Sequence, residues 1–283
     1  MHLFAWLMSN TSHISIATLL IGNIDRPEFS GTRRVLDTAG PVLGVCDVDS
    51  AIAAVEETRI APELIVLAQA FPGEFSRAQV ERLCRLAPLA RVVGLLGSWC
   101  EGEVRTGSPW PAVVRVYWHQ WPARSRGEIK HWRQGTQSVW GLPITATEEE
   151  RLLYSVRRPL AKRDGVVAIH TARYEMEEWL SAACRQRGYA TVWLRPPRPA
   201  RIEGARAVVF DGTDGEGAEC HRLRHLAGAV APTPLIVLLD FPRVQDRRRV
   251  LSAGAAAVLS KPLDIDDLFG ELDRLTRAVD EPE

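Results

Sequence analysis

The sequence predicts an α/β protein with two domains, each built on a parallel β-sheet that carries helices on both faces. In both halves of the chain, short apolar segments alternate with segments of helical periodicity, an order typical of doubly wound sheets. The chain has 283 residues, enough for two domains of ordinary size. Hydrophobic residues make up 46% of it and charged residues 25%, so each half can bury a core.

The second half shows the alternation most clearly. We expect strands at Val166–Ile169, Ala190–Leu194, Ala207–Phe210, Leu235–Leu239 and Ala256–Leu259. We expect helices at Tyr174–Arg187, Glu219–Ala229 and Val244–Ala253, with a last helix that begins at Asp264. Gly188 follows the first of these helices, where a helix stop is typical. Asp264 is a favourable N-cap, and apolar residues at helical spacing follow it.

The first half follows the same order less regularly. We expect strands at Ala17–Ile21, Val42–Val45, Leu64–Leu67, Arg91–Leu96 and Ala112–Tyr117, and helices at Phe29–Thr38, Ser50–Thr58 and Phe75–Ala87. The segment SWCEGEVRTGSPWP holds two glycines and two prolines in fourteen residues, which predicts a long loop before the last strand. Residues 136–163 are predicted to be a linker with a short helix, because Thr147 and Glu150 form a capping-box pattern.

Composition narrows the classes of function. The formal net charge is zero, so no overall charge attracts the chain to nucleic acid or to a membrane. The five cysteines are odd in number and form no C-x-x-C pair, which favours a reducing cytoplasm without disulfides or structural zinc. The N-terminal MHLFAWLMSN lacks a basic region and a cleavage site, and no apolar run reaches the about 18 residues of a membrane helix. We therefore expect a cytoplasmic protein.

Three passages of the second half carry a family resemblance. AVVFD resembles the third strand of a receiver domain, which ends in the phospho-acceptor aspartate; PLIVLLD resembles the fourth strand; and GAAAVLSKPLDIDDLF resembles the fifth strand with its Lys-Pro pair and last helix. Residues 164–279 thus resemble the CheY-like receiver domain of bacterial two-component response regulators. The resemblance implies a flavodoxin-like fold, with Asp211 as candidate phospho-acceptor and Lys261 as its candidate phosphate or ion-pair partner.

Spacing within the chain indicates an internal repeat. The positions of Asp211, Leu239 and Lys261 lie 143 residues after Ala68, Leu96 and Trp118, and PELIVLAQAFP resembles another third strand. Near the first helix of each half the offset is 148, from Gly40 to Gly188, which predicts a shortened helix at RPPRPAR in the second domain. We therefore expect two receiver-like domains in tandem: an extension at 1–13, a first domain at 14–135, the linker at 136–163, a second domain at 164–279 and a tail at 280–283.

Phosphorylation of an aspartate needs more than the aspartate. A Mg²⁺ ion held by oxygen ligands must offset the phosphoryl charge, a lysine must neutralise a further oxygen, and a hydroxyl must sense the new group. The resemblance implies an acidic pair after the first strand, but the second domain reads His170, Thr171 and Ala172 there. The hydroxyl position reads Leu239, and a substitute metal ligand from Asp240 or Asp214 is the alternative.

The first domain departs further from the receiver pattern. Ala68 has no nucleophile, Leu96 has no hydroxyl and Trp118 is not a lysine. Both domains are therefore predicted to be degenerate receivers, or pseudo-receivers. We expect Asp211 and Lys261 to persist as an ion pair, with no metal site and no cofactor; Mg²⁺ would be needed only if Asp211 is active.

Six of the nine tryptophans lie between residues 99 and 140. Because tryptophan and arginine are enriched at binding hot spots, this segment is a candidate interaction surface. Its candidate residues are Trp99, Glu101, Glu103, Arg105, Trp110, Trp118, His119 and Trp121. Alternatively, the rings fill the space of a missing helix or lie between the two domains. Arginines interleave with these aromatics, as in surfaces that bind single strands, but no nucleic-acid motif is present, and we do not expect nucleic acid as a partner.

The resulting hypothesis is a non-catalytic signalling or scaffold protein. It would act by contact with an unknown signalling protein, or with a second copy of itself, through tandem pseudo-receiver domains. One alternative is an atypical response regulator that is phosphorylated on Asp211. Another is an enzyme with a site around residues 98–121, where His119 would have to approach Glu101, Glu103 or Cys100.

Overall fold

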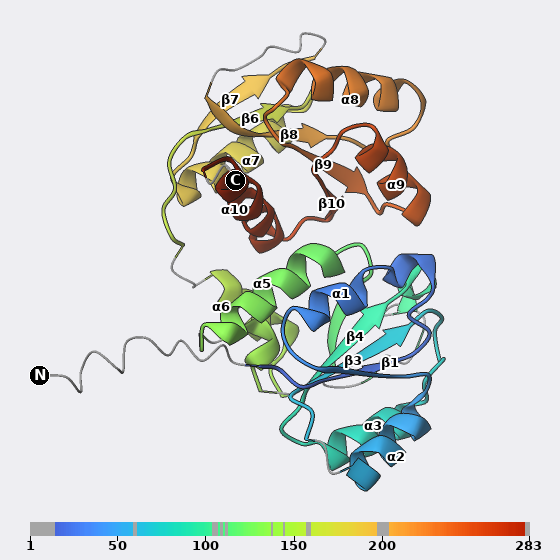
Figure 1. The fold of residues 1–283 in the computed structure, drawn as a ribbon. Helices are drawn as coiled ribbons and strands as arrows, with labels where there is room; N and C mark the ends of the chain where they lie inside the picture. The colour runs from blue at the N-terminus through green and yellow to red at the C-terminus, as the bar shows by residue number, and fades with distance from the viewer. Residues whose placement is uncertain are drawn as a thin grey trace, which may run out of the picture. The chain divides into compact units, whose positions relative to one another are not determined.

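The structure is a computed structural model that describes residues 15–58, 61–103, 107, 110, 113–136, 138–143, 145–156, 160–196 and 204–280. It contains two five-stranded parallel sheets (Figure 1). The chain divides into two compact units, one made of the residues up to 118 together with 125–151, the other of residues 119–124 together with 152–283. The predicted first domain, 14–135, includes residues 119–124, which the structure groups with the second unit. The predicted extension 1–13 lies outside the described residues, as does most of the predicted tail.

The first sheet has the strand order β2-β1-β3-β4-β5. Its strands are β1 Thr18–Ile21, β2 Val42–Val45, β3 Leu64–Gln69, β4 Arg91–Leu96 and β5 Val114–Tyr117. All five strands predicted for this half are present. Every residue of β3 is buried, as expected for an apolar strand that is covered on both faces.

The helices of the first unit lie on both faces of its sheet. They are α1 Thr32–Asp37, α2 Val48–Thr58, α3 Arg77–Leu86 and most of α5 Trp121–Arg133, with short 3₁₀ turns η1 Pro27–Phe29, η2 Ser98–Cys100 and η3 Val139–Gly141. Helix α6 Glu148–Val156 has residues in both units, because the division falls after residue 151. Ile52 of α2 and Leu83 of α3 pack in the core below one face, while Figure 1 shows α1 and α5 at the opposite face. The capping box predicted for α6 is present: the Thr147 amide donates to Glu150 Oε2 at 2.8 Å, and the Glu150 amide donates to Thr147 Oγ1 at 3.2 Å.

Helix α5 was not among the predicted elements. Its sequence, WPARSRGEIKHWR, carries a glycine in its middle and three arginines, so that its apolar periodicity is weak. Proline in the first turn, here Pro122, is compatible with a helix start, and three basic residues near the C-terminal end complement the helix dipole. These local signals are the ones that point to the helix.

The second sheet has the order β10-β9-β8-β6-β7, which is the same arrangement when read from the other edge. Its strands are β6 Val166–His170, β7 Ala190–Leu194, β8 Ala205–Asp211, β9 Leu235–Asp240 and β10 Ala257–Lys261. Its helices are α7 Tyr174–Arg187, α8 Gly217–Val230, α9 Val244–Ser252 and α10 Ile265–Asp280. Both sheets thus have the 2-1-3-4-5 order of flavodoxin-like folds, and the predicted fold class is confirmed.

Two cores enclose the second sheet. Helices α7 and α10 pack on one face through residues such as Leu180 and Leu272, and α8 and α9 pack on the other through residues such as Leu223 and Val250 (Figure 1). Helix α7 ends at Gly188, as predicted, in the left-handed conformation with φ 101°. A Cβ at this position would lie 2.3 Å from a backbone oxygen, so only glycine fits there.

Strand register supports the internal repeat. In the first sheet Ala68 pairs with Leu95, and in the second sheet Asp211 pairs with Leu238. Both positions are displaced by 143 residues (211 − 68 and 238 − 95). At the first two strands the register pairs 21 with 45 and 170 with 194, an offset of 149, one more than the 148 predicted from the two glycines. The predicted short helix at RPPRPAR falls mostly on residues 197–203, outside the described part of the chain.

The segment between β4 and β5 is only partly described. It begins with the turn η2 and passes Trp110, which is buried in the first core. The loop predicted for residues 98–111 includes 104–106, 108–109 and 111, which lie outside the described residues. No helix among the described residues combines the length and the apolar composition that crossing a bilayer requires.

Candidate functional site

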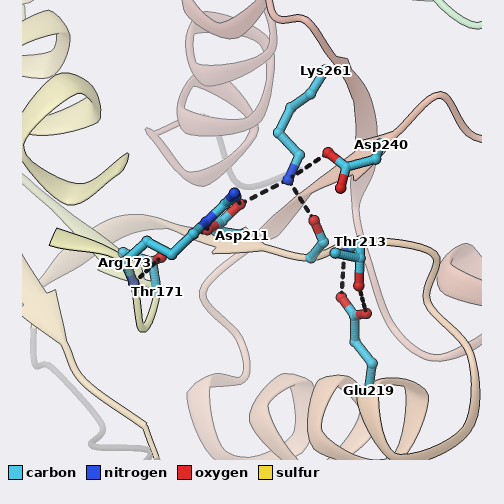
Figure 2. A network of polar contacts seen from close by, with 8 residues as sticks. Thr171, Arg173, Asp211, Thr213, Glu219, Asp240 and Lys261 are labelled. Carbon is cyan, nitrogen blue, oxygen red and sulfur yellow. Dashed lines mark hydrogen bonds and ion pairs between the residues drawn. The ribbon is translucent and has the colours of Figure 1, made fainter. Parts of the chain in front are cut away.

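The candidate site lies at the carboxyl edge of the second sheet. Asp211 is the last residue of β8, Lys261 the last of β10 and Asp240 the last of β9. Thr171 and Arg173 lie in the loop between β6 and α7. Because the strands are parallel, their carboxyl ends meet at one edge, where open α/β sheets bind ligands. Figure 2 shows these side chains converging on Asp211 and Lys261.

The Asp211 carboxylate accepts hydrogen bonds from three side chains. Lys261 Nζ donates to its Oδ1 at 2.9 Å, Arg173 donates through Nη2 to Oδ1 and through Nε to Oδ2, and Thr171 Oγ1 donates to Oδ2 at 2.7 Å. The Asp211 side chain is only 4% exposed. Each oxygen thus accepts two bonds, which matches the roughly four lone-pair sites of a carboxylate. Both oxygens of Asp211 are occupied.

The charges of this network hold Asp211 in its ionised form. Burial by itself would raise the pKa of Asp211, but the hydrogen bonds from Arg173, Lys261 and Thr171 outweigh it, and the pKa is lowered. The same hydrogen bond raises the pKa of Arg173. The Arg173 side chain is 52% exposed, so the ion pair is buried on the aspartate side and hydrated on the arginine side.

Lys261 joins Asp211 to two further acceptors. Its ammonium donates to the Gly212 carbonyl at 2.6 Å and lies 2.9 Å from Asp240 Oδ1. The ammonium therefore has three acceptors around it, which accounts for all its donors. Two cations, Arg173 and Lys261, thus balance two carboxylates, Asp211 and Asp240.

The other positions considered for phosphate or metal chemistry have different surroundings. Leu239, at the expected hydroxyl position, is buried in the core that α8 and α9 cover. Asp214 accepts the Glu216 amide at 2.8 Å. His170 stacks on Phe210 with ring centroids 5.0 Å apart, and burial lowers its pKa. Among the residues that the structure describes, no three His, Cys, Asp or Glu side chains are grouped to hold a metal ion.

A second carboxylate anchors the loop that follows Asp211. Glu219 of α8 accepts the Thr213 amide at 2.7 Å and the Thr213 hydroxyl at 2.5 Å (Figure 2). A Cβ on Gly212 would lie 2.2 Å from Glu219 Oε1, so a larger residue there would displace the Glu219 carboxylate from this position. The loop is therefore tied to α8 and presents the Gly212 carbonyl to Lys261.

The corresponding edge of the first sheet holds different chemistry. Ala68, the counterpart of Asp211, is buried and has no nucleophile. The next residue, Gln69, donates through Nε2 to both carboxylate oxygens of Glu103 at 3.3 Å, and Arg115 Nη2 donates to Glu103 Oε2 at 3.1 Å. Glu103 is thus buried and forms an ion pair with the partly buried Arg115. Burial raises the pKa of the neighbouring Cys100 to about 11, which leaves it a neutral thiol at physiological pH.

The candidate interaction residues of the tryptophan-rich segment separate into two groups. Trp99 is 69% exposed, and Glu101 is also exposed. The buried residues are Glu103, Trp110, Trp118, His119 and Trp121. Arg105 lies outside the described residues. Trp110 donates from Nε1 to the Phe75 carbonyl at 3.0 Å, and His119 Nδ1 lies 2.8 Å from Ser260 Oγ within the second unit.

Trp99 has neighbours that the sequence did not reveal. The Phe71 ring, 44% exposed, lies 6.2 Å from the Trp99 ring, and the Arg26 guanidinium lies 4.7 Å above the Phe71 ring. The three residues follow β1, β3 and β4, and so they meet at the carboxyl edge of the first sheet. We call Arg26, Phe71 and Trp99 the aromatic surface.

The strand order and register of both sheets, with Asp211 and Lys261 at strand ends, identify the type of fold. The fold is receiver-like. Solved receiver domains resemble this chain over about two fifths of its length.

No protein-family model matches the chain, and no curated protein is similar enough to match it. Three solved structures illustrate the likeness. A CheY-like response regulator protein from Mesorhizobium loti is 18% identical, covers 40% of this chain and 99% of its own, and has a TM-score of 0.32. The receiver domain of a signal transduction histidine kinase from Syntrophus aciditrophicus is 22% identical, with 42% and 95% coverage and a TM-score of 0.35. The pilus assembly protein CpaE from Caulobacter crescentus is 19% identical, with 42% and 96% coverage and a TM-score of 0.32.

Two residues of the Asp211 network, Thr171 and Arg173, had no predicted role. The sequence feature that could have revealed them is their position directly after the first strand of the second sheet, where the receiver resemblance implies metal ligands. A hydroxyl and a guanidinium at this place can bind a carboxylate directly. No sequence pattern singled out Phe71 or Arg26, because they come close to Trp99 only where three separate loops meet.

Proposed function

We propose that this protein acts by protein–protein contact through two degenerate receiver-like domains, without phosphoryl transfer and without catalysis. The observation that carries the proposal is the complete occupation of the Asp211 carboxylate by Lys261, Arg173 and Thr171. To attack phosphorus, a carboxylate oxygen needs a lone pair that is not already accepting a hydrogen bond. In this site each oxygen already accepts two hydrogen bonds.

The charged groups that surround the Asp211 carboxylate also support the proposal. Mg²⁺ takes oxygen ligands, usually including carboxylates, and the loop after β6 offers the guanidinium of Arg173 instead. A guanidinium is a donor only and cannot ligate a cation. Asp240, a further carboxylate at this edge of the sheet, is paired with Lys261. An internal cation thus takes the place beside Asp211 that a metal ion would need.

Phosphorylation is tested on the full chain with a small phosphodonor. The protein is incubated with acetyl phosphate and Mg²⁺, and its intact mass is measured beside that of Asp211→Asn. We expect both proteins to keep their unmodified mass. A stoichiometric phosphoryl adduct on the wild type that is absent from Asp211→Asn would overturn the proposal and support the atypical response regulator.

The aromatic surface is the part of the molecule that best fits a protein contact. Tryptophan, arginine and other aromatic residues are enriched at binding hot spots, and a tryptophan that is 69% exposed covers no core of its own unit. Arg26 also donates from Nε to Glu28 Oε1 at 3.2 Å, which holds its guanidinium over Phe71. A side chain that is already held in place by such contacts loses less conformational entropy when a partner binds.

A matched pair of tryptophan variants tests this contact. Trp99→Ala removes the most exposed ring of the aromatic surface, and Trp179→Ala removes an exposed tryptophan of the second unit. In quantitative pull-downs with the full chain, the partners that the wild type captures should be lost with Trp99→Ala and retained with Trp179→Ala. Sedimentation velocity separates self-association from a foreign partner. Equal partner sets and equal sedimentation for all three proteins would contradict a role of the aromatic surface.

A further inference from the structure

The second unit contains a pocket of about 460 Å³ beside the Asp211 network. One wall comes from the start of α7 and the other from the connection between β10 and α10. Its apolar lining is formed by Met176, Trp179, Leu238, Pro262 and Leu263. The pocket thus lies at the carboxyl edge of a parallel sheet, where open α/β folds bind ligands.

The size and lining of the pocket fit a small molecule. Small-molecule sites typically enclose about 300–1,000 Å³ and are mainly apolar, with a few polar groups that fix the orientation of the ligand. Trp179 is 43% exposed although it lines the pocket, so a bound ligand would cover apolar ring surface that is now in contact with water. Burial of this ring surface would stabilise the complex.

The polar groups of the pocket carry opposite charges. Arg173 directs only Nε and one Nη2 hydrogen at Asp211, so part of its donor set stays available on its exposed side. Glu175 is exposed, lines the same pocket and supplies a carboxylate. Lys261 also lines it, but the three acceptors around its ammonium leave chiefly its aliphatic stem for a ligand.

These charges select the kind of ligand. A simple apolar anion would gain the Arg173 contact but meet the Glu175 carboxylate, and an apolar cation would meet the opposite conflict. A ligand with both charges satisfies both groups. We propose that the pocket binds a small apolar zwitterion of amino-acid or dipeptide size, with its carboxylate on Arg173, its ammonium on Glu175 and its apolar side chains against Trp179 and Met176.

This inference does not rest on the proposed function. The pocket belongs to α7 and to the β10–α10 connection, whereas the aromatic surface belongs to the first unit. The partner contact at Trp99 can therefore fail while the pocket binds its ligand, and the reverse also holds. The pocket shares Arg173 and Lys261 with the Asp211 network, so the intact-mass test on Asp211 and the ligand titration are measured separately.

The experiment uses the full chain and the dipeptide Leu-Phe as probe, measured by isothermal titration calorimetry and by saturation-transfer NMR. N-acetyl-Leu-Phe lacks the ammonium, Leu-Phe amide lacks the carboxylate, and N-acetyl-Leu-Phe amide lacks both. We expect Leu-Phe to bind at millimolar concentration or below, and each blocked form to bind about tenfold more weakly or worse. Equal binding of all four forms would overturn the zwitterion assignment, and no binding of Leu-Phe would overturn the site.

Variants locate the binding on the protein. Trp179→Ala and Glu175→Gln change exposed side chains, so the fold should persist, and circular dichroism verifies it. Trp179→Ala should weaken Leu-Phe binding at least about tenfold, and Glu175→Gln should abolish the preference for Leu-Phe over its N-acetyl form. Trp99→Ala, an exposed tryptophan of the other unit, should bind as the wild type does. If Trp179→Ala binds Leu-Phe unchanged, the pocket is not the site.

Discussion

At the residue scale, the Asp211 network shows how a receiver-like site can be filled by its own side chains. Arg173 lies two residues after Thr171, and both donate to the same carboxylate. The guanidinium of Arg173 and the ammonium of Lys261 therefore neutralise the charge of Asp211 from within the chain. Truncating one partner of such a network leaves a buried charge without its bonds, which costs more than a surface pair of the same geometry.

The lowered pKa of Asp211 predicts a pH dependence. Because the folded state lowers this pKa, the ionised aspartate stabilises the fold above its ordinary pKa of about 4, and this stability is lost as pH falls through the lower folded value. Urea unfolding of wild type and Asp211→Asn should therefore differ by about 1–3 kcal/mol near neutral pH, and the difference should shrink on acidification. The control Asp37→Asn, in an exposed pair with Arg33, should show no comparable trend.

The arginine of the network predicts a stability loss of its own. Arg173→Gln removes the bidentate contact and leaves Asp211 with Lys261 and Thr171. Because the Arg173 side chain is half exposed, solvent compensates part of the loss, and we expect a cost of about 1 kcal/mol in the free energy of unfolding. Arg77→Gln, in the exposed pair with Glu81 on α3, should cost close to nothing. Equal values for both variants would show that the network does not stabilise the fold.

At the element scale, local sequence patterns predicted the ends of helices more accurately than the presence of a helix. The Thr147–Glu150 pair marks the start of α6, and Gly188 marks the end of α7, both as predicted. Helix α5 was not predicted because its glycine and arginines interrupt the apolar periodicity. Capping depends on a few neighbouring residues, whereas the choice of a buried face depends on the rest of the fold.

The cap of α6 can be measured. Thr147→Ala removes the oxygen that accepts the Glu150 amide, and we expect it to lower the free energy of unfolding by about 1 kcal/mol. Thr145→Ala is the matched control, because Thr145 is exposed and lies before the helix; it should stay within about 0.5 kcal/mol of the wild type. Chemical denaturation of both variants decides the point, and a Thr145→Ala loss as large as that of Thr147→Ala would refute the cap.

At the scale of the whole molecule, the chain repeats one architecture with two different chemistries. The two sheets share strand order and register, yet one edge holds the Asp211 network and the other holds the Glu103 ion pair. Parallel sheets need only apolar strands and covering helices, so the fold tolerates exchange of the residues at its edge. Each unit also has cores of its own.

Separate cores predict separate responses to core truncation. Leu67→Ala in the first core and Leu180→Ala in the second each leave a cavity, at a cost of about 2–5 kcal/mol. Hydrogen exchange followed by mass spectrometry should show faster exchange of β1 and β3 in Leu67→Ala, and of β6 and β8 in Leu180→Ala. Uniform acceleration across both sheets in either variant would mean that the chain unfolds as one cooperative body.

The sequence by itself determined the fold class, ten strands, most helices and the 143-residue repeat, because apolar periodicity and spacing are local properties of the chain. It also singled out Asp211 and Lys261, through their place at strand ends. Only the tertiary structure decided what surrounds them. Arg173 reaches Asp211 across 38 residues, and Arg26, Phe71 and Trp99 meet from three loops. Contacts between distant loops depend on how the strands are ordered in the sheet, and no spacing in the sequence encodes that directly.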